Sequence, residues 1–176
     1  AESLRMPLEQ ARSFYAEQAD AAALMLDNLE RGEGFILGDM TGIGKGRVVA
    51  AAIEYALVNG RLPIFITDRP NLFRDILRDL EGIGTSYRVP LNPLILNDGV
   101  SIRNELGEEI MRSTPRSEVT RIMESGDLED YNCLFLTYSQ INRAAERSEK
   151  VAWLLRLAEG SAMVIDESHN AGGDSN

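Results

Sequence analysis

A glycine-rich loop between an apolar run and a helical segment constrains this chain most. Residues 38–47 have the sequence GDMTGIGKGR, and the apolar run Phe35–Leu37 precedes them. Gly42 and Gly44 allow main-chain N–H groups to turn toward an anion without a Cβ in the way. A helix that begins at Lys45 adds unpaired N–H groups and the positive end of its dipole. This order of strand, loop and helix is typical of a loop that binds phosphate groups.

The loop departs from the common phosphate-loop pattern at two positions. Asp39 stands where a first glycine is usual, which leaves the T-G-x-G-K core intact. Gly46 replaces the usual serine or threonine, so this position has no hydroxyl to offer to Mg²⁺. A glycine in the first helical turn also costs about 1 kcal/mol relative to alanine. That cost indicates either a close approach to the backbone or a side chain that is missing for a purpose.

Two carboxylates directly follow the last apolar run of the chain. Residues 162–165 (AMVI) are followed by Asp166 and Glu167, and Asp166 lies 121 positions after Lys45. Parallel strands end at the same edge of a sheet, so we expect Asp166 beside the phosphate loop. Asp166 would hold Mg²⁺ there, and Glu167 would orient and deprotonate an attacking water. Taken alone, the pair is equally consistent with two solvated carboxylates at a strand end.

Apolar runs alternate with amphipathic segments along the chain. We expect strands at 35–37, 63–67, 94–96, 133–137 and 162–165. We expect helical segments at 7–30, 47–59, 72–80 and 151–158, and an insertion of helical pieces at 99–130. Strands that are apolar on both faces and alternate with helices indicate a parallel sheet covered on both sides. The prediction is an α/β fold of three layers with a mostly parallel sheet.

Composition and charge narrow the class of protein. The 176 residues are 44% hydrophobic and 26% charged, as expected for one globular domain. No apolar run approaches the roughly 18 residues of a membrane span. The single cysteine, Cys133, and the single histidine, His169, exclude an internal disulfide and any site built on two histidines. We expect Cys133 in the core rather than as a nucleophile, and a reducing, cytoplasmic location for the chain.

The net charge is −10, whereas a protein that binds nucleic acid by itself usually has a basic surface. Any contact with nucleic acid would therefore need a local patch or other parts of a larger protein. Four arginines in the insertion are candidates for such a path, but interleaved acidic residues favour an ordinary solvated surface. These arginines are Arg103, Arg112, Arg116 and Arg121.

Two segments of the sequence resemble a known family. GDMTGIGKGR at 38–47 and DESHNAGG at 166–173 resemble motifs I and II, the Walker A and DEAH-like motifs, of superfamily-two helicase-like ATPases. The Gly46–Arg47 ending resembles the strawberry notch group in particular, where G-K-G-R replaces G-K-T. The resemblance covers the chain from about Gln18 to its end. It implies a P-loop NTPase lobe of the RecA-like kind that uses ATP and Mg²⁺.

The resemblance also implies roles for individual residues. Catalysis would involve Lys45, Glu167 and His169, and Asp166 would bind the metal. Gln18 resembles the upstream glutamine that reads adenine, with Gln10 as a competing candidate and a plain exposed helix residue as the alternative. The loop residues that would bind the ATP phosphates are Thr41, Gly42, Ile43, Gly44, Lys45, Gly46 and Arg47.

Two further segments occupy the places of motifs that contact the nucleic-acid backbone in such motors. They are Phe65–Asn71 and Thr137–Ser139, although ordinary turn residues explain either segment equally well. The expected organisation is an N-terminal helical segment, 1–33, followed by the ATP-binding lobe, 34–176. The chain stops soon after motif II, so we expect a fragment of a larger protein. In that protein a second RecA-like lobe would complete the site.

The sequence therefore predicts the ATP-hydrolysing lobe of a helicase-like, nucleic-acid-dependent ATPase, a translocase or remodeller. DNA is the expected nucleic acid, with RNA left open. One alternative is a nucleotide-gated interaction module that binds ATP but hardly hydrolyses it, which Gly46 and the acidic surface favour. Another is a small-molecule kinase, although no lid arginine cluster or acceptor segment is recognisable.

Overall fold

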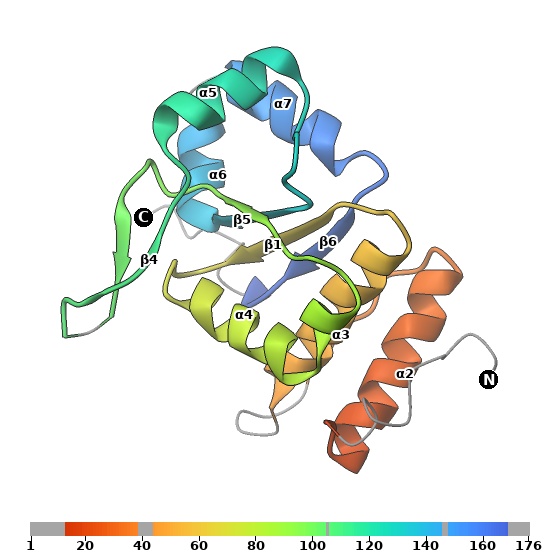
Figure 1. The fold of residues 1–176 in the computed structure, drawn as a ribbon. Helices are drawn as coiled ribbons and strands as arrows, with labels where there is room; N and C mark the ends of the chain where they lie inside the picture. Colours follow the sequence, from red (N-terminus) through yellow and green to blue (C-terminus); the bar gives the residue numbers. More distant parts are fainter. Residues whose placement is uncertain (1–12, 39–43, 105, 146–147, 169–176) are drawn as a thin grey trace, which may run out of the picture.

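The computed structural model of the chain describes residues 13–38, 44–104, 106–145 and 148–168. In that part of the chain, a four-stranded parallel sheet has helices on both faces (Figure 1). The strand order is β2-β5-β1-β6. The strands are β1 (Pro63–Thr67), β2 (Pro93–Ile95), β5 (Cys133–Thr137) and β6 (Ala162–Ile165). This architecture confirms the predicted α/β fold with a mostly parallel sheet.

The helices form the two outer layers. On one face lie α3 (Lys45–Val58) and α4 (Leu72–Gly82), with α2 (Ala16–Glu30) packed beside α3 and the short η1 (Thr85–Tyr87) after α4. On the other face lie α5 (Arg116–Ser125), α6 (Tyr138–Ala145) and α7 (Ser148–Ala158). None of the helices in the described part of the chain has the length and apolar character needed to cross a membrane.

Each face of the sheet has its own hydrophobic core, because successive strand residues point to opposite faces. Phe65 and Phe135 point toward α3 and α4, where their rings pack edge to face with centroids 5.5 Å apart. Phe73 of α4 joins them, with its ring centroid 6.4 Å from that of Phe65. On the other face, Ile64 packs in a cluster that includes the buried Trp153 of α7. Burial on both faces explains why these strands read as continuous apolar runs.

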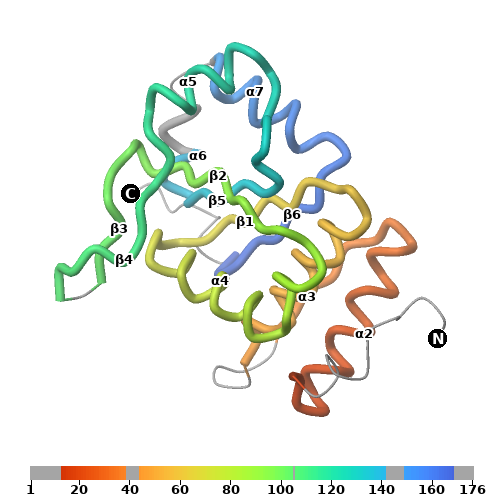
Figure 2. Tube along the Cα trace, in the orientation of Figure 1, coloured from red at the N-terminus to blue at the C-terminus, as the bar shows by residue number. Residues whose placement is uncertain are grey.

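The insertion at 99–130 contains an expected helical piece, α5, but its first half differs from the expectation. It contains an antiparallel hairpin of β3 (Ser101–Arg103) and β4 (Glu109–Arg112), which extends to one side of the sheet (Figure 2). Asn104 makes the turn, because its Oδ1 accepts the N–H of Leu106 at 3.0 Å and that of Glu108 at 2.9 Å. Gly107 has a φ of +80°. This local turn chemistry overrides the helix propensity of the neighbouring residues.

The expectation of a buried strand at 35–37 is wrong in this structure. Phe35 and Leu37 are half-buried and pack against the core beside α3, but Ile36 is 91% exposed. A strand requires a neighbouring strand to pair its N–H and C=O groups. The described residues place no strand beside 35–37, nor on the outer edge of β6. The predicted helix at 7–30 is present as α2, and residues 7–12 lie outside the described part.

A buried ion pair joins α3 to the segment after α4. Glu54 is 7% exposed, and its Oε2 accepts hydrogen bonds from the Thr85 hydroxyl at 2.6 Å and from the Arg88 guanidinium. Arg88 also donates to the Ile83 carbonyl at 3.1 Å. Breaking such a pair leaves a charge buried without compensation. The pair therefore anchors α3, the helix that begins at the phosphate loop.

We expect Arg88→Met to lower the free energy of unfolding by about 3 kcal/mol, because Glu54 would lose its buried countercharge. Urea titration followed by circular dichroism measures this change. Arg31→Met is the control: Arg31 makes an exposed pair with Asp27, which typically contributes less than about 1 kcal/mol. The double variant Glu54→Leu/Arg88→Met should recover most of the loss. Equal effects of the Arg88 and Arg31 variants would contradict the anchoring role.

Candidate functional site

The carboxyl ends of β1, β5 and β6 meet at one edge of the sheet, and Asp166 lies there. Thr67 ends β1 and pairs in register with Thr137 of β5, and both are almost fully buried. The Thr67 hydroxyl donates to Asp166 Oδ2 at 3.3 Å. The main-chain N–H of Asp166 donates to the Ile66 carbonyl at 2.8 Å. Strand β1 therefore fixes both the backbone and the carboxylate of Asp166.

The electrostatics of Asp166 connect it to the phosphate-loop helix. Burial of its carboxyl raises the pKa of Asp166, and the negative charge of Glu167 raises it further. A hydrogen bond from Thr67, one from the Glu167 main chain and the positive charge of Lys45 oppose that rise in pKa. The charge on Lys45 thus acts on a carboxylate 121 positions away in sequence. The fold brings together the first residue of α3 and the end of β6.

Glu167 follows in a strained backbone conformation. Its φ is +53°, in the left-handed region that non-glycine residues rarely adopt, and its side chain is exposed. This conformation costs on the order of 1–2 kcal/mol for a residue with a Cβ. Strain of this kind persists only where surrounding contacts impose it, and it is common at functional sites.

Gly44 needs to be glycine for two reasons. It is the N-cap of α3 with a φ of +75°, and a Cβ at this position would lie 2.2 Å from Nε2 of Gln18. That nitrogen donates to the Gly44 carbonyl at 3.1 Å, while Oε1 of Gln18 accepts the Tyr15 N–H at 3.0 Å. Gln18 is 4% exposed. The glutamine thus joins α2 to the end of the phosphate loop, and its reading of adenine stays a prediction.

A carboxylate from α4 explains the absence of a side chain at Gly46. A Cβ at this position would lie 2.0 Å from Oδ2 of Asp79 and 3.1 Å from its Cγ. The distance from this Cβ position to Oδ2 of Asp79 is only slightly longer than the distance from the Cβ of a serine to its own hydroxyl oxygen. Burial raises the pKa of Asp79, whereas Arg78 and Arg47 lower it. Any side chain at position 46 would therefore compete with the Asp79 carboxylate for the same space.

We expect Gly46→Ala and Asp79→Ala to be strongly non-additive. Alone, Gly46→Ala should lower the free energy of unfolding by about 1 kcal/mol, because the added Cβ displaces a half-buried carboxylate. In the Asp79→Ala background it should raise that energy by about 1 kcal/mol, the helix-propensity gain over glycine. Urea unfolding of the four proteins measures the coupling. Additive effects would show that Asp79 does not determine the residue at position 46.

The structure describes only some of the other predicted site residues. The Arg47 guanidinium donates to the Ser13 carbonyl, which joins α3 to the start of the described chain. Thr41, Gly42 and Ile43 lie outside the described residues, as do Gln10 and His169. Their predicted roles remain predictions.

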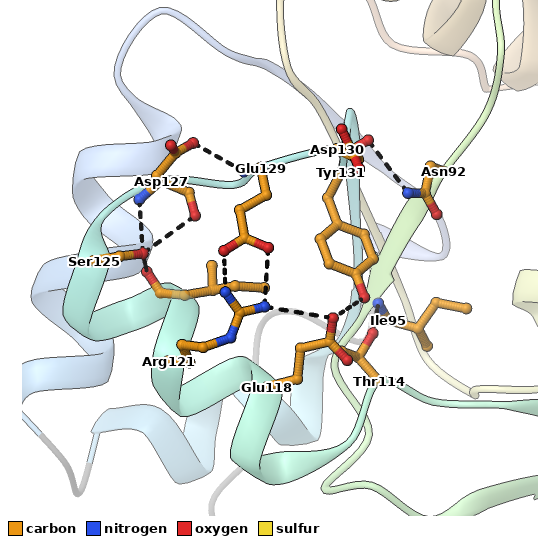
Figure 3. A network of polar contacts seen from close by, with 11 residues as sticks. Asn92, Ile95, Thr114, Glu118, Arg121, Ser125, Asp127, Glu129, Asp130 and Tyr131 are labelled. Atoms are coloured by element: carbon orange, nitrogen blue, oxygen red, sulfur yellow. Dashed lines mark hydrogen bonds and ion pairs between the residues drawn. The ribbon is translucent and has the colours of Figure 1, made fainter.

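The arginines considered for a nucleic-acid path all have partners within the chain. Arg121 pairs with Glu129 and contacts Glu118, whose carboxylate also accepts the hydroxyl of Tyr131 (Figure 3). These contacts connect α5 to the loop that precedes β5. The guanidinium of Arg103 donates to the Gly107 carbonyl, that of Arg112 to the Glu109 carboxylate and that of Arg116 to the Asp98 carbonyl. The contacts favour the interpretation of an ordinary solvated surface.

Cys133 is a core residue, as expected. It is 1% exposed at the start of β5, and burial raises the pKa of its thiol to about 12. A thiol with that pKa stays protonated at neutral pH and does not act as a nucleophile. In the described ranges, no group of three or more His, Cys, Asp or Glu side chains is placed to hold a metal ion.

Sequence reasoning missed the residues that hold the site together. No local pattern indicates Asp79, although the unusual Gly46 indicated either a close approach to the backbone or a side chain missing for a purpose. Thr67 and Tyr138 fall inside the two segments compared with nucleic-acid contact motifs, but their contacts with Asp166 have no sequence signal. The Tyr138 hydroxyl donates to the Asp166 carbonyl at 2.7 Å.

Comparison with known proteins adds one finding. A family model described as P-loop containing NTP hydrolase pore-1 matches residues 8–175, nearly the whole chain. The searches of curated proteins and of solved structures give no match. The matched range contains both the loop that ends at Lys45 and the carboxylates after β6. The chain therefore belongs to the P-loop containing NTP hydrolase pore-1 family.

Proposed function

We propose that this chain is the ATP-binding and ATP-hydrolysing lobe of a helicase-like, nucleic-acid-dependent ATPase related to the strawberry notch group. In the whole protein it would work with a second RecA-like lobe as a DNA translocase or remodeller. The observation that carries the proposal is that α3, which begins at Lys45, packs against β6, whose carboxyl end leads directly into Asp166. Open α/β sheets bind their ligands at that edge.

The donors at this edge suit a metal that arrives with the nucleotide. Mg²⁺ keeps several water ligands and is usually held by one or two carboxylates together with phosphate oxygens. Asp166 supplies a carboxylate that β1 holds in place, whereas the described residues contain no larger acidic or histidine cluster. When bound, Mg²⁺ neutralises charge that develops on the phosphates. We propose Asp166 as the protein ligand of Mg²⁺.

The remaining roles follow from position. Lys45 begins α3, where the helix dipole and unpaired N–H groups favour phosphate, and its ammonium would bind the β and γ phosphates. Glu167 has an exposed carboxylate next to Asp166 and would orient and deprotonate the attacking water. Gln18 would read adenine from its place against the loop backbone, and His169 would link hydrolysis to the second lobe.

A nucleotide-gated module with little hydrolysis is the second candidate. The contact between Gly46 and Asp79 supports it, because a carboxylate lies 2.0 Å from the point where a side chain at position 46 would begin, and this position has no hydroxyl for Mg²⁺. Hydrolysis of ATP transfers a phosphoryl group to water, and this transfer needs Mg²⁺ at a defined position. A protein that binds ATP through Lys45 but positions Mg²⁺ poorly would act as a switch.

ATP hydrolysis by the polypeptide that carries this chain together with its second lobe separates the two candidates. We expect double-stranded DNA to raise the hydrolysis rate severalfold, and RNA to raise it less. ATP binding without turnover, with or without DNA, would favour the switch. No binding at millimolar ATP and Mg²⁺ would reject both candidates.

A further inference from the structure

Asp166 and Glu167 form a corner directly after β6, and contacts from two other elements of the fold hold this corner. Strand β1 holds Asp166 through the Ile66 carbonyl and the Thr67 hydroxyl. The second support comes from Tyr138, the first residue of α6, which follows β5 directly. Its hydroxyl donates to the main-chain carbonyl of Asp166 at 2.7 Å. This contact reaches across β1, which lies between β5 and β6 in the sheet.

The Tyr138 contact acts on the conformation of Glu167. The Asp166 carbonyl and the Glu167 N–H belong to one rigid peptide plane. Rotation of that plane changes ψ of Asp166 and φ of Glu167 together. A hydrogen bond that fixes the carbonyl therefore holds Glu167 at its φ of +53°. Without that bond, the strain in the left-handed conformation favours rotation, which would redirect the Glu167 carboxylate.

The surroundings of Tyr138 keep its hydroxyl a donor. Burial of the phenol raises its pKa, and the charges of Asp166, Asp68 and Glu167 raise it further. The phenol therefore stays protonated at neutral pH, as a hydrogen bond to a carbonyl requires. Tyr138 also lies between Thr137 and Ser139, whose hydroxyls are 2.9 Å apart and bonded to each other.

We propose that Tyr138 is a positioning residue for Glu167 that couples the segment Thr137–Ser139 to ATP hydrolysis. This inference rests on the proposed function, in which Glu167 activates water. A nucleic-acid phosphate bound by the exposed Ser139 hydroxyl and by the N–H groups at the start of α6 would stabilise that end of the helix. The Tyr138 hydroxyl transmits that change to the peptide plane before Glu167. Nucleic acid thereby favours the conformation in which the carboxylate faces the water.

Tyr138→Phe tests the proposal, because it removes the hydroxyl and keeps the ring. In the polypeptide with its second lobe, we expect the DNA-stimulated kcat to fall about 10-fold, or about 1.4 kcal/mol in the barrier. KM and Kd for ATP should stay within about 2-fold, since the phosphate loop is untouched. The stimulation ratio should fall with kcat, which a purely structural role of the tyrosine would not produce.

Tyr131→Phe is the matched control. Tyr131 is also half-buried and donates its hydroxyl to Glu118 at 2.8 Å, but it belongs to the α5 network (Figure 3). Its loss should leave kcat and stimulation unchanged. Equal kcat values for wild type and Tyr138→Phe would overturn the proposal.

A structural measurement keeps this result separate from the proposed function. In a crystal structure of Tyr138→Phe, we expect Glu167 to leave the left-handed region, while Tyr131→Phe retains it. A variant that keeps the wild-type Asp166 carbonyl and Glu167 φ would overturn the positioning role even if neither protein hydrolyses ATP. Absence of hydrolysis in the wild type, with the expected rotation in the variant, would instead reject the proposed function.

Discussion

Lys45→Ala should abolish the thermal stabilisation of this chain by ATP and Mg²⁺. A ligand at 100 times its Kd stabilises the native state by about 2.7 kcal/mol. For a chain of this size, that raises Tm by about 5–10 °C. The alanine variant lacks the ammonium that compensates phosphate charge at the start of α3, so we expect a shift of less than about 1 °C. Scanning calorimetry with and without the nucleotide measures both values.

Lys150→Ala provides the control, because the chain contains only two lysines. The Lys150 ammonium donates to Oε1 of Gln140 on α6 at 3.3 Å. This variant should keep the full stabilisation by ATP. Acetylation followed by mass spectrometry gives a second measurement, in which ATP protects Lys45 and leaves Lys150 reactive. A normal Tm shift in Lys45→Ala would contradict the nucleotide site.

Glu167→Gln should separate ATP binding from ATP hydrolysis. The amide keeps the size of the side chain but cannot accept a proton from water. General-base catalysis typically contributes 10²- to 10⁴-fold, so we expect a loss of turnover of that order. The Kd for ATP should change by less than about 3-fold, because phosphate binding depends on Lys45 and the loop. Single-turnover hydrolysis and equilibrium titration measure the two quantities, in the polypeptide that we propose to carry this chain and a second lobe.

Glu159→Gln is a matched substitution outside the site. Glu159 is exposed after the end of α7, so its variant should retain wild-type turnover. Near-normal hydrolysis in Glu167→Gln would assign the activation of water to another residue. Parallel loss of binding and turnover would indicate that Glu167 supports the structure of the corner rather than the chemistry.

The central strands were predictable because burial on both faces leaves a local pattern. The expected strands at 63–67 and 133–137 agree with β1 and β5 residue for residue. The expected strand at 162–165 agrees with β6, although β6 lies at the edge of the described sheet and Met163 and Ile165 are about half exposed. The hairpin of β3 and β4 was not predicted, because Asn104 and Gly107 determine a turn within a segment of good helix formers. Helix α6 was missed as well, since it begins directly after the last residue of β5 with no loop between them.

Several candidate residues could be named from the sequence where backbone geometry demands particular residue types, and their chemical roles stay predictions. A left-handed N-cap requires a residue such as Gly44, and a phosphate loop requires a cation such as Lys45 beside it. Asp166 follows from the rule that parallel strands end at one edge. Gly46 stood out as unusual, but its cause, the carboxylate of Asp79, became visible only in the packing of α4 on α3.

The amino-acid sequence by itself determined the layers of this protein, the phosphate loop and the carboxylates that follow β6, because each depends on neighbours along the chain. The tertiary structure alone decided how these parts are held. The contacts of Gln18 with Gly44, of Asp79 with Gly46 and of Tyr138 with Asp166 join residues 26 or more positions apart. Such contacts arise from helix packing and strand order, which no local periodicity encodes.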